Sequence, residues 1–212
     1  MSARRRRTHV KGPALRDLAI PSVMVVIMLV MGIIFGSIAA QTLDPMEKNR
    51  LVQFLGRFSQ SLLNGMPSAK ASPEAAIIAN LQKLGAVWVL AVTVIGAPFI
   101  LAMMFLQGIA TGFTVAILVS EWSIKGLLLA LASVVPHNAF LVGGLGVSSA
   151  AGLTHAWTCA KSLFVREVTP LRARLFVFSL ICLICAAVLV VGGLVEAYLS
   201  PLLLRKVAPL VF

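Results

Sequence analysis

Long apolar runs separated by short polar segments make up most of this chain. The first run extends from Leu18 to Ala40, about the length that a helix needs to cross the hydrocarbon core of a bilayer. The run from Leu84 to Val119 is too long for one span and allows two short or tilted ones. Two further runs cover Pro136 to about Thr158 and about Leu175 to Val195. The pattern predicts an all-α, polytopic membrane helical bundle of about five spans.

Helix breakers interrupt the apolar sequence in the centre of the chain. Pro98 and Gly108 are the expected breaks, so we expect two spans joined tightly near Gln107-Gly108. The run Gly126–Val135 is too short to cross and stops at Pro136, which predicts a half-helix. Within lipid, broken helices persist only where protein or trapped water satisfies the freed backbone groups. These breaks therefore predict the packed interior of the bundle.

Polar side chains beside these breaks allow two interpretations. His137 and Asn138 follow Pro136 within apolar sequence. Two half-helix ends could meet there and line a polar site, as in transporters. Alternatively, Pro136 causes a kink, and His137 and Asn138 satisfy its freed backbone groups. Glu121 and Lys125 lie four residues apart, a spacing that permits an ion pair on one helical turn.

Two glycine pairs have the spacing of close helix packing. Gly32 and Gly36 lie on the first apolar run, and Gly108 and Gly112 lie on the second. Such small-residue pairs let two membrane helices approach closely. The first pair makes a homo-oligomer possible. The second predicts a partner backbone near Gly112, where leucine should disrupt the packing.

Residues 41–83 form the sizeable segment outside the predicted spans. Asp44-Pro45 begins a helix well, because a capping oxygen precedes a proline at the first position. Ser72-Pro73-Glu74 marks a second helix start. The first of these helices could lie on the outer membrane surface, pack on the bundle or bind a partner. Its apolar stripe supplies the candidate docking residues, which recur at helical spacing: Leu51, Leu55, Phe58 and Leu62.

Composition and charge agree with a membrane protein. The chain is 59% hydrophobic and 12% charged, half the charged share of ordinary soluble domains. Its net charge of +11 does not indicate nucleic-acid binding, because the basic residues lie beside apolar runs. The basic tail 1–17 and the basic loop 161–174 are typical of cytoplasmic segments. The first run, 18–40, is then an uncleaved anchor, 41–83 is extracytoplasmic, and 84–212 holds about four further spans with an extracytoplasmic C-terminus.

Candidate chemistry is sparse. Cys182 and Cys185 have a redox or metal spacing but lack further ligands nearby, so we expect apolar-tolerant packing residues. Ser148 faintly resembles an intramembrane nucleophile, but His155 lies two turns along the same helix. We therefore expect no catalytic residues, no metal and no cofactor.

Three blocks of the sequence resemble the stage II sporulation protein M family. They are Gly108-Ile109-Ala110-Thr111-Gly112-Phe113-Thr114-Val115, Val134-Val135-Pro136-His137-Asn138-Ala139-Phe140-Leu141 and Val195-Glu196-Ala197-Tyr198-Leu199-Ser200-Pro201. The order of a basic tail, an anchor, an amphipathic helix and further spans is similar too. Glu196 joins the central candidates through this resemblance.

The resemblance implies a non-enzymatic scaffold in the mother-cell membrane at the septum. Family members hold two peptidoglycan-degrading partners, stage II sporulation proteins D and P, during engulfment of the forespore. The broken helices around Pro98 and Pro136 support a different function, that of a small channel or transporter.

Overall fold

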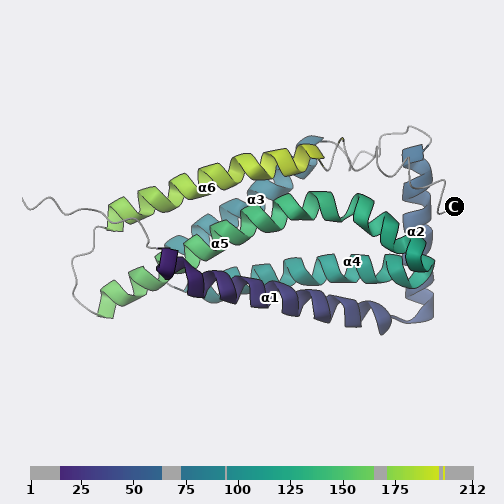
Figure 1. Cartoon of the computed structure of the whole chain (residues 1–212), viewed down its shortest axis with the longest axis horizontal. Coiled ribbons are helices and arrows are strands. Elements are labelled where there is room, and N and C mark those ends of the chain that lie inside the picture. The colour runs from purple at the N-terminus through teal and green to yellow at the C-terminus, as the bar shows by residue number, and fades with distance from the viewer. Residues whose placement is uncertain (1–14, 64–72, 94, 165–170, 196–197, 199–212) are drawn as a thin grey trace, which may run out of the picture.

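The computed structural model describes residues 15–63, 73–93, 95–164, 171–195 and 198, which form six helices and no strand. Five of these helices contain stretches long and apolar enough to cross a membrane, and α2 does not. The predicted all-α, five-span fold is therefore confirmed (Figure 1). The helices are α1 (Leu15–Gln41), α2 (Pro45–Leu63), α3 (Pro73–Val92), α4 (Gly96–Ser133), α5 (Val135–Phe164) and α6 (Leu171–Leu194).

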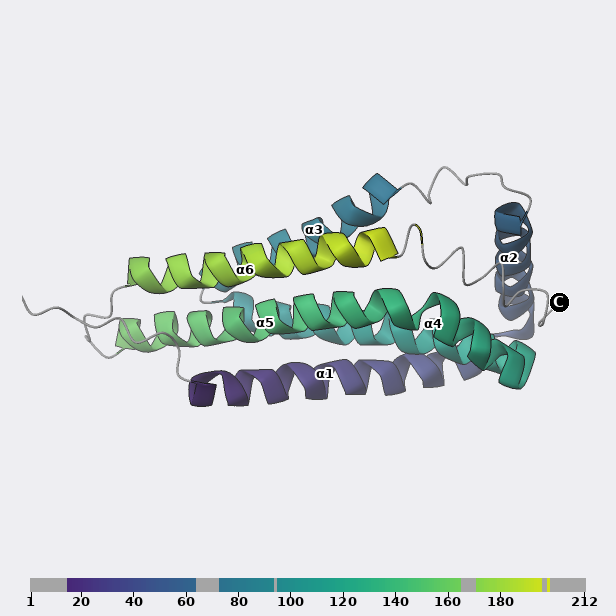
Figure 2. The same ribbon diagram turned by 45° about the horizontal axis from the view of Figure 1, so that its top comes forward.

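The five long helices lie side by side, and α2 crosses one end of the bundle (Figures 1 and 2). Contacts between helices give their directions. The region of Gly32 and Gly36 in α1 meets that of Gly108 and Gly112 in α4 in the same order, so these helices run parallel. Ile77 of α3 contacts Gly193 of α6, and Trp88, later in α3, bonds to Ser179, earlier in α6. Helices α3 and α6 are therefore antiparallel. Helices α1, α4 and α6 thus run one way, and α3 and α5 run back.

The centre of the bundle is an apolar core to which four spans contribute its best-buried side chains. Five of these side chains each expose 1% of their surface or less: Val87 of α3, Ile100 and Met104 of α4, Leu141 of α5 and Leu189 of α6. Large apolar side chains also cover the outside, including Phe176 and Leu183 of α6. An outer surface this apolar suits lipid rather than water.

The break between α3 and α4 lies at residues 93–95, so the expected break at Gln107-Gly108 is wrong. The Gly96 amide donates to the Thr93 carbonyl oxygen (3.1 Å) and closes a tight turn. Pro98 follows in the first turn of α4, where a missing N–H costs no helical hydrogen bond. Gly108 continues the helix because it packs directly on α1.

Helix α4 reverses direction at Ser123, whose backbone has φ 50° and ψ −125°. A Cβ on Gly126 would overlap the Leu118 carbonyl oxygen, although a straight helix separates residues eight apart by about 12 Å. Residues 124–133 thus form a short helix that runs back along α4, where a half-helix over Gly126–Val135 was expected. The expected stop at Pro136 is wrong, because this helix continues into α5: the Val134 amide donates to the Ala130 carbonyl oxygen (2.8 Å).

The two glycine pairs pack against each other within the chain. A Cβ on Gly32 would overlap the carbonyl oxygen of Phe105, and one on Gly112 would overlap that of Ile33. The prediction of a partner backbone beside Gly112 is confirmed, and the partner is α1. Gly32 and Gly36, whose spacing alone would also permit a dimer, instead pack against α4 of the same molecule.

Candidate functional site

The end of the bundle crossed by α2 is the first candidate site. Helix α2 begins at Pro45, as the Asp44-Pro45 pair predicts, and the Lys48 amide donates to the Asp44 carbonyl oxygen (3.0 Å). Between α1 and α2, the Thr42 hydroxyl donates to the Ala39 carbonyl oxygen (3.1 Å) and stabilises the end of α1. A short turn therefore sets α2 across the bundle rather than along it (Figure 2).

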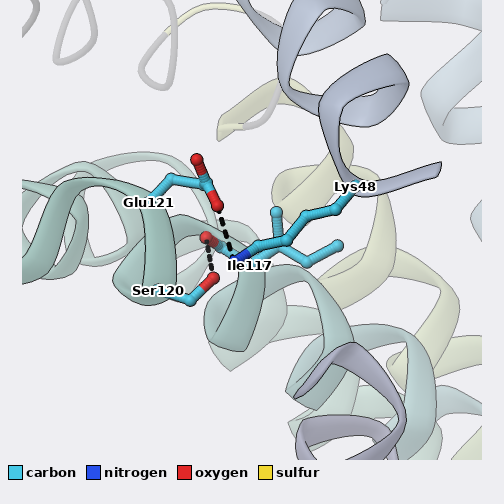
Figure 3. Close-up of polar contacts among 4 residues, drawn as sticks. All are labelled: Lys48, Ile117, Ser120 and Glu121. Atoms are coloured by element: carbon cyan, nitrogen blue, oxygen red, sulfur yellow. Dashed lines mark hydrogen bonds and ion pairs between the residues drawn. The ribbon is translucent and has the colours of Figure 1, made fainter. Parts of the chain in front are cut away.

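An ion pair joins α2 to the reversal of α4. Lys48 Nζ lies 2.7 Å from Glu121 Oε1, two residues before Ser123 (Figure 3). Glu121 therefore pairs with a residue of another helix, and the reversal at Ser123 interrupts the helical turn on which a pair with Lys125 was expected. The paired side chains are 32% and 25% exposed, so the pair contributes at most about 1 kcal/mol. Its effect is on the orientation of α2.

The ion pair indicates which side of α2 faces the bundle. At about 100° per residue, the predicted apolar stripe lies beside Lys48 on the helix circumference. Lys48 and Leu51 are half-buried, while Met46, Arg50 and Arg57 on the opposite side are exposed, as is Phe54 between that side and the stripe. The side chains of the other stripe residues lie outside the described part of the chain: Leu55, Phe58 and Leu62. The described positions therefore direct the stripe side toward the bundle and the opposite side outward.

A chain of polar side chains inside the bundle is the second candidate site. Lys83 Nζ of α3 donates to Gln107 Oε1 of α4 (3.2 Å), and Gln107 Nε2 donates to Asn138 Oδ1 of α5 (3.4 Å). Thr111 Oγ1 also donates to Asn138 Oδ1 (3.3 Å). Asn138 Nδ2 donates to the Val134 carbonyl oxygen (3.0 Å), which also accepts a bond from the Asn138 amide (3.1 Å) and so is not a group freed by Pro136.

This polar chain links three spans through hydrogen bonds that apolar side chains cannot make. Buried Asn80 lies one helical turn from Lys83, and its Nδ2 has no partner among the described residues. Pro98, the other proposed break, lies nine residues before Gln107, or about 14 Å along α4. The breaks at Pro98 and Pro136 therefore do not meet at one site. The side chain of His137 and the whole of Glu196 lie outside the described residues.

Among the cysteine, serine and histidine side chains of the described part of the chain, Cys159 Sγ lies 3.5 Å from His155 Nε2, one helical turn away on α5. Ser148 Oγ donates to the Leu145 carbonyl oxygen (2.9 Å), while His155 stacks on Phe178 with ring centroids 5.5 Å apart. Cys182 and Cys185 are buried in the apolar core, as expected for packing residues. No group of three His, Cys, Asp or Glu side chains there could hold a metal ion.

Sequence reasoning missed which side of α2 is exposed. The exposed side alternates apolar and basic residues, so no apolar stripe reveals it. The polar residues Glu121 and Lys125 did mark the region of the reversal before the short helix, but a serine carries no local preference for positive φ, so Ser123 itself gives no signal.

A comparison with family models decides the identity of the family. The model described as Stage II sporulation protein M matches residues 25–201, which include most of the chain. The chain belongs to the stage II sporulation protein M family. It is therefore a sporulation-related, multi-pass membrane protein. No curated protein and no solved structure matches the chain.

The family match can be related to the geometry. The block around Gly108 and Gly112 makes the close contact with α1, and the block around Asn138 makes the bonds at the start of α5. The third block ends the matched region at position 201, beyond α6. Two of the three blocks thus lie at contacts between spans.

Proposed function

We propose that this chain is a non-enzymatic scaffold of the forespore engulfment machinery. It anchors peptidoglycan-degrading partners, stage II sporulation proteins D and P, at the septal membrane of the mother cell. One observation carries the proposal: α2 is an amphipathic helix fixed across the end of a membrane bundle, with one side open. A scaffold needs such a surface at a constant height above the membrane.

The charge distribution supports an outward position for α2. The bundle end opposite α2 carries Lys161, Arg172 and Arg174, where α5 ends and α6 begins. Basic residues beside spans favour the cytoplasmic side. The α2 end then faces the space that contains peptidoglycan, and so does the C-terminus beyond α6.

Two experiments test the scaffold. Deletion of the chain in its source organism should stop sporulation at engulfment, and reintroduction of the chain should restore it. Affinity purification of the chain from sporulating cells should recover both hydrolases. A nutrient or ion phenotype without an engulfment block would contradict the proposal, as would purification that recovers neither hydrolase.

The predicted apolar stripe is tested separately with Leu55→Asp and Phe58→Asp together. If the stripe itself binds the hydrolases, this variant loses them while still reaching the membrane. If the stripe faces the bundle, the aspartates loosen α2 and increase its hydrogen exchange. Unchanged hydrolase recovery would exclude the stripe as the docking surface.

The second candidate function, a small channel or transporter, is favoured by one observation. Lys83 lies inside a span and bonds to polar side chains of two other spans, and intramembrane ionisable residues often mark transport pathways. Flux through liposomes containing the purified chain tests it. Transport requires a flux that Asn138→Leu or His137→Ala abolishes, and the absence of flux for every tested solute would exclude it.

A further inference from the structure

The outward side of α2 has a regular arrangement of apolar and basic side chains. Met46, Arg50, Phe54 and Arg57 follow one another at spacings of three or four residues, which places them on one helical face. Met46 is 67% and Phe54 65% exposed, and both arginines are exposed. Arg50 and Arg57 lie seven residues apart, or about 10 Å along the helix, with Phe54 between them.

The charge of this face is not neutralised by the described part of the chain. The salt bridge there joins Lys48 to Glu121 on the other side of α2, and neither arginine takes part in it. Glu47 lies at the edge of the face in the first helical turn, where the positive end of the helix dipole favours an acidic residue. The two arginines therefore form the charged centre of the face.

The orientation of α2 argues against a lipid surface as the occupant. Lys48 attaches the opposite side of α2 to the end of the bundle, so Arg50 and Arg57 point away from the spans and from the bilayer around them. Phe54 is exposed beside them, between this face and the apolar stripe. An anionic polymer of the cell wall would engage the arginines but would leave Phe54 and Met46 in water. Arginine with an aromatic residue is instead the composition of the energetically important centres of protein interfaces.

We propose that this face of α2 binds an acidic protein surface. That surface presents two carboxylates about 10 Å apart, one for each arginine, on either side of an apolar pocket that receives Phe54. The inference rests on the proposed function, because it specifies where and how the scaffold holds its hydrolase partners.

The test measures binding of the purified extracytoplasmic domain of each proposed hydrolase to the full chain in nanodiscs of zwitterionic lipid. Arg50→Glu with Arg57→Glu should weaken binding of at least one domain by about tenfold or more, and Phe54→Ala should do the same. Rising salt should weaken the wild-type complex, and the charge-reversed variant should lose most of this dependence. Asn49→Ala, at an exposed position of the same helix outside this face, is the matched control, and its binding should remain within about twofold of wild type. Equal thermal unfolding of all variants excludes loss of the fold.

The possible results distinguish failure of the assigned binding face from failure of the proposed scaffold function. Wild-type binding that survives both the charge reversal and Phe54→Ala overturns the assigned face but leaves the scaffold intact. Absence of wild-type binding to both domains overturns the scaffold and the face together. Retained hydrolase binding, with arginine-dependent binding to vesicles of anionic lipid or to purified wall polymer instead, would assign the face to that other occupant and overturn the inference.

Discussion

At the scale of single residues, Asn138 connects the backbone of α5 to the side chains of α4. Its Oδ1 accepts hydrogen bonds from Gln107 and Thr111, and its Nδ2 donates to the Val134 carbonyl oxygen. Gln107 in turn accepts a bond from Lys83. In an apolar interior, removal of one side chain of this group leaves a polar atom of its neighbour with one partner fewer and no water to replace it, which costs about 1–3 kcal/mol.

This dependence predicts coupling between Gln107 and Asn138. Gln107→Leu and Asn138→Leu should each lower the free energy of unfolding by about 1–3 kcal/mol. The double variant should lose less than the sum, by about 0.5–2 kcal/mol, because it removes both ends of one bond. Reversible unfolding in detergent or bicelles measures all three. Thr114→Val is the control, since the hydroxyl of exposed Thr114 donates within its own helix, to the Ala110 carbonyl oxygen. Additive losses would show that the bond contributes nothing.

Ser123 carries the one positive φ among the described non-glycine residues. Its φ of 50° and ψ of −125° resemble the first central position of a type II′ turn, which glycine prefers. A side chain in such a conformation costs about 1–3 kcal/mol, which the surrounding packing offsets. Leu118 before the reversal and Leu129 and Ala130 after it form a small apolar cluster that holds the turn closed.

Replacement of Ser123 by glycine should therefore stabilise the protein. Ser123→Gly should raise the free energy of unfolding by about 1 kcal/mol, because glycine adopts this backbone without strain. Ser120→Gly, only one turn earlier but within regular helix, should lower it by a similar amount. Ser123→Val should lower it further. Thermal unfolding of the three variants checks these signs, and a destabilised Ser123→Gly would mean that the reversal is not strained.

At the scale of elements, the contact between α1 and α4 depends on four glycines. Their Cα atoms allow the two backbones to touch, and a Cβ at any of them would overlap a carbonyl oxygen of the other helix. Gly85 and Gly143 also lie in spans, but no atom lies within 4 Å of a Cβ added there. Gly85 and Gly143 are therefore control positions for the substitution of glycine by alanine.

Alanine should have opposite effects at the two kinds of glycine. Gly36→Ala and Gly112→Ala should lower the free energy of unfolding by about 1–3 kcal/mol because α1 and α4 must separate. Gly85→Ala and Gly143→Ala should raise it by about 0.5–1 kcal/mol through better helix propensity. Gly112→Leu should cost more than Gly112→Ala. Similar effects at all four alanine positions would show that the α1–α4 contact does not depend on close approach.

The sequence could predict the features that local chemistry determines, but not those that tertiary packing determines. Run lengths predicted five spans, and Pro45 and Pro73 marked helix starts, because these signals act within a few residues. The predicted break at Gly108 was wrong because the helix continues there and Gly108 packs on α1, which is far away in sequence. In the candidate site, the sequence predicted α2 and its apolar stripe. It could not predict which side faces outward, because Lys48 finds Glu121 only in the folded bundle.

At the scale of the whole molecule, the helix directions agree with the order of the chain. Each successive span runs opposite to the one before, so α1, α4 and α6 point toward the α2 end and α3 and α5 point away. The α2 end and the Lys161 end must therefore lie on opposite sides of any bilayer that the bundle spans. The positive-inside rule then predicts that the Lys161 end lies in the cytoplasm.

Labelling of single cysteines tests this assignment across the whole molecule. In a background with Cys159, Cys182 and Cys185 changed to alanine, Arg57→Cys and Lys161→Cys each introduce one exposed thiol at opposite ends. A membrane-impermeant maleimide should label the Arg57→Cys thiol in intact cells, because α2 lies outside. It should label the Lys161→Cys thiol only after the membrane is opened. The reverse pattern would place α2 in the cytoplasm, where it could not reach partners that act on peptidoglycan. Labelling of both thiols in intact cells would contradict the odd number of spans on which the scaffold depends.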